Sequence, residues 1–313
     1  MSPDTRRLRT VRGLALIIGA LSLVVVAVSA YLRLDAAGLG CVDWPACYGR
    51  ILSQDLQPLH YGFPRLLHRF AASAALVLTC LLVWRCLRPQ PLLPAARHAV
   101  LLLLLMLALS ALGFFSADPR RALVGFLNII GGLGLVTFSW RVAMAAASSA
   151  AYRGSHEGIA KVVLLRVGVF ALTITVVLGA WIGATYSASA CLTLPLCEAN
   201  ASLSADAWRV MDPLVKLTAA GVPGEAGGAL LHLLHRGFAL TVLLTLGWAA
   251  AANLKQAATR PSAVAVLGFL VAAAGLGGAA VMSGLSLLLV VGHGVVAALL
   301  LAAVAALLRH QRK

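Results

Sequence analysis

Eight apolar stretches, each about 20 residues long, constrain the fold of this chain more than any other feature of its sequence. A hydrocarbon core roughly 30 Å thick requires a helix of about this length, and backbone groups in lipid must find their hydrogen bonds within the segment. We therefore predict an all-α membrane protein with eight transmembrane helices. The stretches cover about 13–32, 64–86, 98–116, 122–143, 163–186, 229–252, 262–282 and 285–307.

The charged residues divide between the two ends of these expected helices. The formal net charge of +15 could point to nucleic acid, but 14 of the 25 basic residues fall at the chain termini and in the loops on one side of an eight-span topology, and eight of the ten carboxylates fall on the other side. Because basic loops stay inside, we expect an integral plasma (inner) membrane protein with both termini in the cytoplasm and the loops at 33–63 and 187–228 outside. Residues 1–30 also resemble a cleaved signal peptide, but their apolar stretch is long for one, so we expect a retained helix.

A polar pattern occurs twice against this apolar background. Cys41 and Cys47 are separated by five residues, as are Cys191 and Cys197, and the two pairs are 150 residues apart. A His-Arg pair follows each, 167 residues apart, near the start of the next apolar stretch. Such internal repetition predicts two repeated four-helix bundles. The halves are expected at 1–146 and 163–313, joined by a cytoplasmic linker at 147–162.

The cysteines divide by compartment. Cys41, Cys47, Cys191 and Cys197 are expected outside, where disulfides persist. Their five-residue spacing is wider than the C-x-x-C of thioredoxin-like catalysts, so both a structural disulfide in each loop and a redox role remain open. Cys80 and Cys86 lie at the inner end of their stretch; we expect both to remain reduced.

Three histidines lie inside apolar stretches, where ionisable side chains are costly and usually functional. His235 and His293 are expected at similar depths in one half, as two axial ligands of a single haem iron require, and Gly292 and Gly294 would let a flat macrocycle approach closely. An interhelical hydrogen bond is the alternative for His293. His232 is predicted to be an interfacial residue near water. The role of His60, in the outer loop, stays open, and the remaining histidines are expected at cytoplasmic ends or loops: His98, His156 and His310.

The first half differs at the position of the second ligand. His68 corresponds to His235, but aligning Gly113 with Gly278 places Asn128 opposite His293. The amide nitrogen of asparagine has no available lone pair, so Asn128 is a poor iron ligand. We predict a six-coordinate haem in the C-terminal half and at most one protein ligand, His68, in the N-terminal half. An open coordination position on an iron there could serve a substrate site or oxygen chemistry. The alternative is that the site has decayed.

The segment Arg33-Leu-Asp-Ala-Ala-Gly-Leu-Gly-Cys-Val-Asp-Trp-Pro-Ala-Cys-Tyr-Gly49 closely resembles the first external loop of haem A synthases of the CtaA type. The resemblance extends over essentially the whole chain and implies that haem O is oxidised at a ring methyl to haem A for cytochrome oxidase assembly. It further implies a haem b (iron) held by His235 and His293. The substrate haem O would lie in the N-terminal half, near His68 and Asn128.

One departure from this family concerns its chemistry. The family usually has a glutamate three residues before the first-half histidine, on the same helical face, and here that residue is Arg65. A guanidinium cannot take up a proton. Arg65 and Arg69, like Arg236 in the other half, are instead expected to pair with haem propionates. Snorkelling towards the membrane surface is the alternative for these arginines.

Three functions follow from these observations. The first is a haem A synthase-like oxidoreductase with His68 and Arg65 at its catalytic site; haem O synthase and oxidase assembly proteins are its expected partners, and a homo-oligomer is left open. The second, prompted by Arg65 and Asn128, is a non-catalytic haem b-binding relative that acts in oxidase assembly or electron transfer. The third is a membrane thiol oxidase acting through the outer cysteines, which would leave the intramembrane histidines without a role.

Overall fold

The computed structural model describes residues 3–36, 62–115, 121–147, 159–197, 205–214 and 225–309, and within these ranges the protein is all-helical. Eight helices are long and apolar enough to cross a membrane, as predicted. They are α1 (Pro3–Ala36), α2 (Gly62–Leu87), α3 (Ala96–Gly113), α4 (Ala122–Ala146), α5 (Ile159–Ala184), α7 (Glu225–Asn253), α8 (Arg260–Met282) and α9 (Leu287–Arg309). Short helices η2 (Ser187–Ala190), α6 (Ala205–Trp208) and η3 (Arg209–Met211) follow α5.

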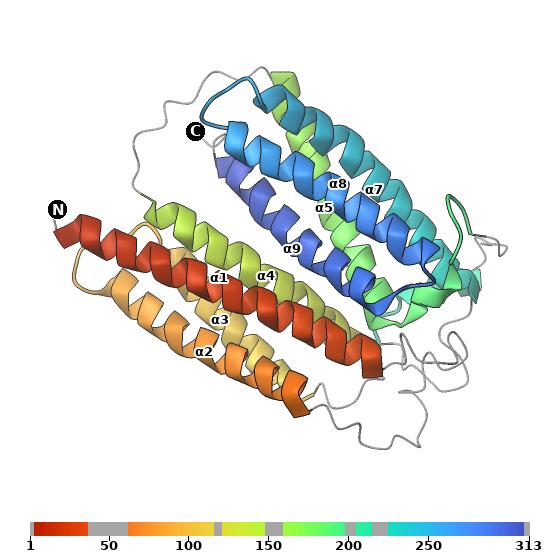
Figure 1. Cartoon of the computed structure of the whole chain (residues 1–313), viewed down its shortest axis with the longest axis horizontal. Coiled ribbons are helices and arrows are strands. Elements are labelled where there is room, and N and C mark those ends of the chain that lie inside the picture. Colours follow the sequence, from red (N-terminus) through yellow and green to blue (C-terminus); the bar gives the residue numbers. More distant parts are fainter. Residues whose placement is uncertain are drawn as a thin grey trace.

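The helices pack in two groups lying side by side (Figure 1). In the first, α1 packs against α2 and α4, and α3 packs against the same two helices. In the second, α5 packs on α7, α7 on α8 and α8 on α9. The two groups meet along a boundary, here called the seam, where α4 and α1 pack against α9 and α4 also packs against α5.

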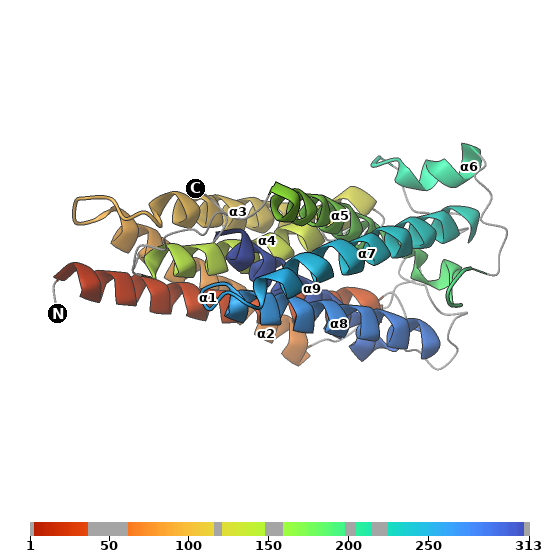
Figure 2. The ribbon, with the colours of Figure 1, turned by 90° about the horizontal axis from the view of Figure 1, so that it is seen from above.

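The two ends of the molecule differ in what they carry. Helix α1 begins and α9 ends at one end, here called the terminal end (Figure 1). The other end, called the disulfide end, holds the Cys191–Cys197 bridge and the short helix α6, which lies far from the start of α1 in the view from above (Figure 2). Arg33 joins the halves near the disulfide end, where its Nη1 donates to the Gly183 carbonyl at 2.9 Å. At the terminal end, Arg309 donates to the Met144 carbonyl.

The first group of helices forms a closed ring and the second does not. Helices α1 and α4 pack along one another, whereas the corresponding pair α5 and α9 is not among the packed pairs of the described chain. Glycines in α4 allow the close approach: a Cβ added at Gly132 would lie 3.1 Å from Val26 Cγ2. Small residues permit membrane helices to pack this closely.

Helix α7 begins at Glu225, four residues before the predicted start at 229. The additional turn packs against the segments that follow α5, since a Cβ added at Gly227 would come within 3.0 Å of Val210 Cβ. Hydropathy alone does not predict this turn, because packing against residues that follow α5 stabilises it, rather than large apolar side chains of its own. As a consequence, His235 lies ten residues into its helix rather than near its start. Helix α5 likewise begins inside the predicted linker 147–162, at Ile159.

Candidate functional site

The structure brings two intramembrane histidines together. His235 of α7 and His293 of α9 have ring centroids 6.3 Å apart, and their ring planes make an angle of 71°. Both residues are half-buried.

Each imidazole is held by a backbone carbonyl of a neighbouring helix. His235 Nδ1 lies 2.9 Å from the Thr175 carbonyl oxygen of α5, and His293 Nδ1 lies 3.0 Å from the Ala273 carbonyl oxygen of α8. A carbonyl oxygen only accepts hydrogen bonds, so Nδ1 must carry the proton in both rings. In a neutral imidazole this leaves the lone pair on Nε2, the state that a metal ligand requires.

A glycine lies beside each ring, one helical turn after the accepting carbonyl. A Cβ added at Gly179 would lie 3.0 Å from His235 Cε1, and one added at Gly277 would lie 3.2 Å from His293 Cε1. In an α-helix the carbonyl of residue i already accepts the N–H of residue i+4. A glycine at i+4 leaves room for a second donor, the imidazole Nδ1–H, beside that bond. The same arrangement therefore positions both rings, on two different helices.

The separation of the two rings fits a metal held between them. With metal–nitrogen bonds of about 2 Å and ring nitrogens about 1 Å from the ring centre, two axial imidazoles have centroids about 6 Å apart. Gly294, next to His293, has nothing within 4 Å of an added Cβ, which leaves space beside the ligand. The described residues contain no group of three or more metal-ligating side chains. These two imidazoles thus suit a metal whose other ligands come from a macrocycle, which is the arrangement in a six-coordinate haem.

His232 was predicted to be a loop-proximal interfacial residue, and its ring lies near the backbone of Ser187 and Ala188 in η2, the segment that follows α5. Its side chain is only 8% exposed, because α7 begins earlier than expected and extends beyond it. Its Nε2 has no hydrogen-bond partner among the described residues.

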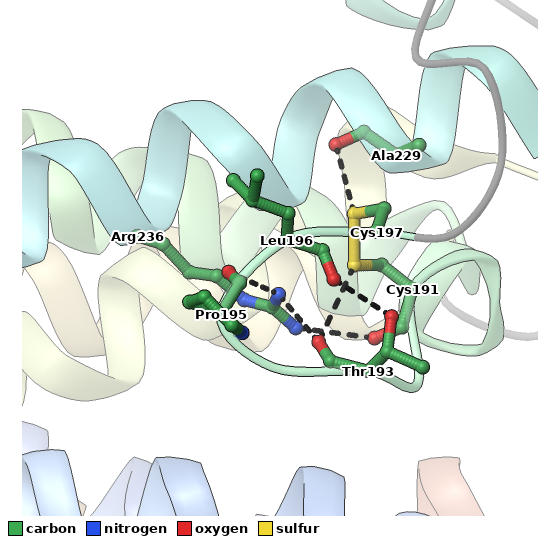
Figure 3. Close-up of a disulfide and its surroundings, with 7 residues drawn as sticks. All are labelled: Cys191, Thr193, Pro195, Leu196, Cys197, Ala229 and Arg236. Carbon is green, nitrogen blue, oxygen red and sulfur yellow. Dashed lines mark hydrogen bonds between the residues drawn. A yellow bond between two sulfur atoms is a disulfide. The ribbon is translucent and has the colours of Figure 1, made fainter.

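Arg236, adjacent to His235, binds the disulfide loop (residues 191–197). Its Nη1 donates to the carbonyls of Thr193 at 2.7 Å and Pro195 at 3.1 Å, and its Nη2 donates to the Cys191 carbonyl at 3.2 Å (Figure 3). The expected Cys191–Cys197 disulfide closes this loop. Pairing of Arg236 with a haem propionate stays a prediction, and the contacts seen are with protein carbonyls.

The first-half residues form no comparable arrangement. His68 of α2 and Asn128 of α4 are half-buried, Arg65 and Arg69 are exposed, and no hydrogen bond of the described chain joins His68 to Asn128. The repeat offsets of 150 and 165 residues place Ser29 opposite Gly179 and Leu112 opposite Gly277. Gly179 and Gly277 accommodate the imidazoles of the second half. The corresponding first-half positions therefore hold no glycine.

Other predicted residues have simpler outcomes. Cys80 and Cys86 are free thiols, as expected. Cys41, Cys47 and His60 lie outside the described residues.

Two further contacts lie at the seam between the halves. Phe126 of α4 packs edge-on against Trp181 of α5 with ring centroids 5.3 Å apart. Burial raises the pKa of the Tyr186 phenol above its usual range, and the nearby Arg33 guanidinium opposes that rise.

Sequence reasoning found the two histidines but missed what holds them. Thr175 and Ala273 act through their main-chain carbonyls, which leave no signature in a sequence. Gly179 and Gly277 are ordinary residues for membrane helices, where glycine is frequent. A search for glycines on helices expected to face a histidine would have found them only once the helix neighbours were known.

Comparison with known proteins gives two matches. Residues 123–305 match the family model COX15-CtaA, described as "Cytochrome oxidase assembly protein". The chain is also 31% identical over 197 residues to a protein of Shewanella oneidensis named "Heme A synthase". That match covers 57% of this chain and 58% of the relative, so the chain spans less than two thirds of the relative's length.

Proposed function

The chain belongs to the COX15-CtaA family of cytochrome oxidase assembly proteins, and on that premise we propose that it is a haem A synthase-type membrane oxidoreductase. Its substrate would be haem O and its product haem A. The similarity to a protein named "Heme A synthase" supports this reaction. The single observation that carries the proposal furthest is the His235–His293 pair, with centroids 6.3 Å apart and both Nδ1 atoms bound to carbonyls.

The resident cofactor would be haem b between α7 and α9. Its iron, when bound, supplies one-electron transfer. His235 and His293 would bind it through Nε2, while the Thr175 and Ala273 carbonyls hold the Nδ1 protons and so fix the ring orientation. Because the two rings come from different helices, a metal held by both would also join α7 to α9.

The substrate would bind in the N-terminal half. His68 of α2 would ligate or position haem O, and Arg65 and Arg69 are exposed cations suited to its propionates. Asn128, opposite His293 in the repeat, leaves one side of the substrate without a protein ligand. We further propose that both chain termini are cytoplasmic and that haem O synthase and oxidase assembly proteins are partners.

The test is to express the chain together with a haem O synthase and to identify the extracted haems by chromatography. Haem A or a hydroxylated intermediate is the expected product, and the double variant His235→Ala/His293→Ala is the matched control that should form neither. Pyridine-haem analysis of the purified protein gives the haem type and number per chain. Haem O that accumulates unchanged in the presence of the wild-type chain would contradict the proposal.

A second function has its own support: a non-catalytic haem b-binding relative. Arg65 and Asn128 replace two residues expected for catalysis, and α1 and α4 close the first ring of helices by packing along one another. This alternative predicts that the double variant Arg65→Glu/Asn128→His forms haem A when the wild-type chain does not. Equal product from both chains would favour the first proposal.

A further inference from the structure

The disulfide loop is attached to α7 directly beside His235. Three of its backbone carbonyls, at Cys191, Thr193 and Pro195, converge on the guanidinium of Arg236 (Figure 3). Arg236 is half-buried, and hydrogen bonds from a charged donor are stronger than neutral ones. The loop also lies along the outer part of α7, where Cys197 Sγ is 3.8 Å from the Ala229 carbonyl oxygen.

The same loop continues from α5 through η2. Helix α5 carries Thr175 and Gly179, which position the His235 ring. Helices α5 and α7 are therefore joined twice: inside the membrane by the bond from His235 to Thr175, and near the disulfide end by the bonds from Arg236 to the loop. A displacement of α7 along α5 would strain both sets of bonds together, since His235 and Arg236 are consecutive residues of one rigid helix.

We propose that the Cys191–Cys197 disulfide is a redox-responsive restraint on His235, with Arg236 as the positioning residue that connects them. The disulfide closes residues 191–197 into a cycle, and this cycle keeps the three loop carbonyls directed at the Arg236 guanidinium. A dithiol reductant supplies two electrons and two protons, which split the S–S bond into two thiols while the dithiol becomes its own disulfide. The open loop then no longer fixes the acceptors of Arg236, so α7 can move relative to Thr175 and His235 is held less firmly.

This inference rests on the proposed haem site, and its experiment measures haem retention rather than catalysis. The purified holoprotein, carrying Cys41→Ser/Cys47→Ser so that one disulfide remains, is mixed with excess apomyoglobin, and the rate of haem transfer is followed by absorbance. Treatment with dithiothreitol, checked by thiol counting, should speed the transfer about tenfold, as loss of a group supporting a ligand typically weakens a metal site by about 10–100-fold. Reduction is carried out on the folded protein, so a folding defect cannot imitate the effect.

Two variants test the role of Arg236. Arg236→Gln should transfer haem about tenfold faster than the parent before reduction, and dithiothreitol should change its rate no further. Arg309→Gln, a change at another arginine that donates to a backbone carbonyl but lies at the terminal end, should keep both the slow rate and the full response to reduction. A reductive effect that persists undiminished in Arg236→Gln would overturn the proposal.

The remaining outcomes separate this inference from the function beneath it. A haem-loaded parent whose transfer rate is the same with its thiols oxidised and reduced would overturn the restraint alone. A protein purified without any haem would overturn the haem site and the restraint together. The electronic spectrum gives a second readout: reduction of the disulfide should weaken the low-spin signal of two-imidazole ligation in the parent but not further in Arg236→Gln.

Discussion

The two halves of this protein share a polar sequence pattern but differ in how their histidines are supported. In the C-terminal half, the centroids of two imidazoles lie 6.3 Å apart, and each ring bonds to a main-chain carbonyl and lies beside a glycine. In the N-terminal half, no hydrogen bond between described residues holds His68, and α1 packs along α4. Glycines serve both arrangements, because Gly132 lets α4 approach Val26 of α1, whereas Gly179 and Gly277 lie beside the imidazole rings.

The same polar pattern thus accompanies two local arrangements: small residues allow two helices to pack closely in one half and lie beside two imidazoles in the other. The experiments that follow would break this distinction between the halves or sharpen it, and they run from the largest expected effect to the smallest.

Removing an imidazole from the second half should have the largest effect. His235→Ala or His293→Ala should reduce bound haem by about 100-fold or more, since each removes a proposed ligand of the iron. Pyridine-haem analysis of the purified variants measures this. His68→Ala is the matched first-half change and should leave the low-spin spectrum intact; if it removed as much haem as the other two, the distinction between the halves would fail.

Adding a side chain beside His293 tests the glycine. Gly277→Val places a Cβ 3.2 Å from His293 Cε1, so the ring must shift and its bond to Ala273 must lengthen. We expect haem affinity to fall by about 10-fold or more, measured by haem transfer to apomyoglobin. The neighbouring Gly278→Val is the control, since nothing lies within 4 Å of an added Cβ there. Equal losses in both variants would show that helix propensity, not the ring, is the cause.

Separating α1 from α4 tests the closed packing of the first half. Gly132→Val should destabilise the protein by about 1–3 kcal/mol, the usual cost of overpacking, because Val26 lies 3.1 Å from the added Cβ. Denaturation in increasing sodium dodecyl sulfate, followed by circular dichroism, measures this change. The haem spectrum should remain that of the parent, and a variant that lost haem without losing stability would refute the independence of the two halves.

The smallest effect is expected at the terminal end of the seam. Arg309→Gln removes the exposed hydrogen bond to the Met144 carbonyl and should cost about 0.5–1 kcal/mol in the same denaturation experiment. Arg33→Gln removes a part-buried bond to Gly183 and should cost about 1.5–3 kcal/mol, since its donor is charged and less accessible to water. The reverse order would show that the halves are joined mainly at the terminal end.

Much of the site followed from local features of the sequence. Eight apolar stretches predicted the eight helices because hydropathy and helix length depend on neighbouring residues alone. His235, His293 and the Cys191–Cys197 pair stood out because charged groups and cysteines are rare in such a background. The start of α7 was misplaced, because the turn after Glu225 is stabilised by packing against residues that follow α5 rather than by its own hydropathy.

The order of the helices, the presence of histidines within them and the unusual residues Arg65 and Asn128 can be known from the sequence, since each depends on residue type along the chain. The carbonyl partners of the two imidazoles, the early start of α7 and the hydrogen bonds from Arg236 to the disulfide loop required the folded protein. These features depend on backbone carbonyls and on distances between helices, and a carbonyl is the same in every residue. Which carbonyl accepts a hydrogen bond from a side chain is decided only when another helix brings a donor to it.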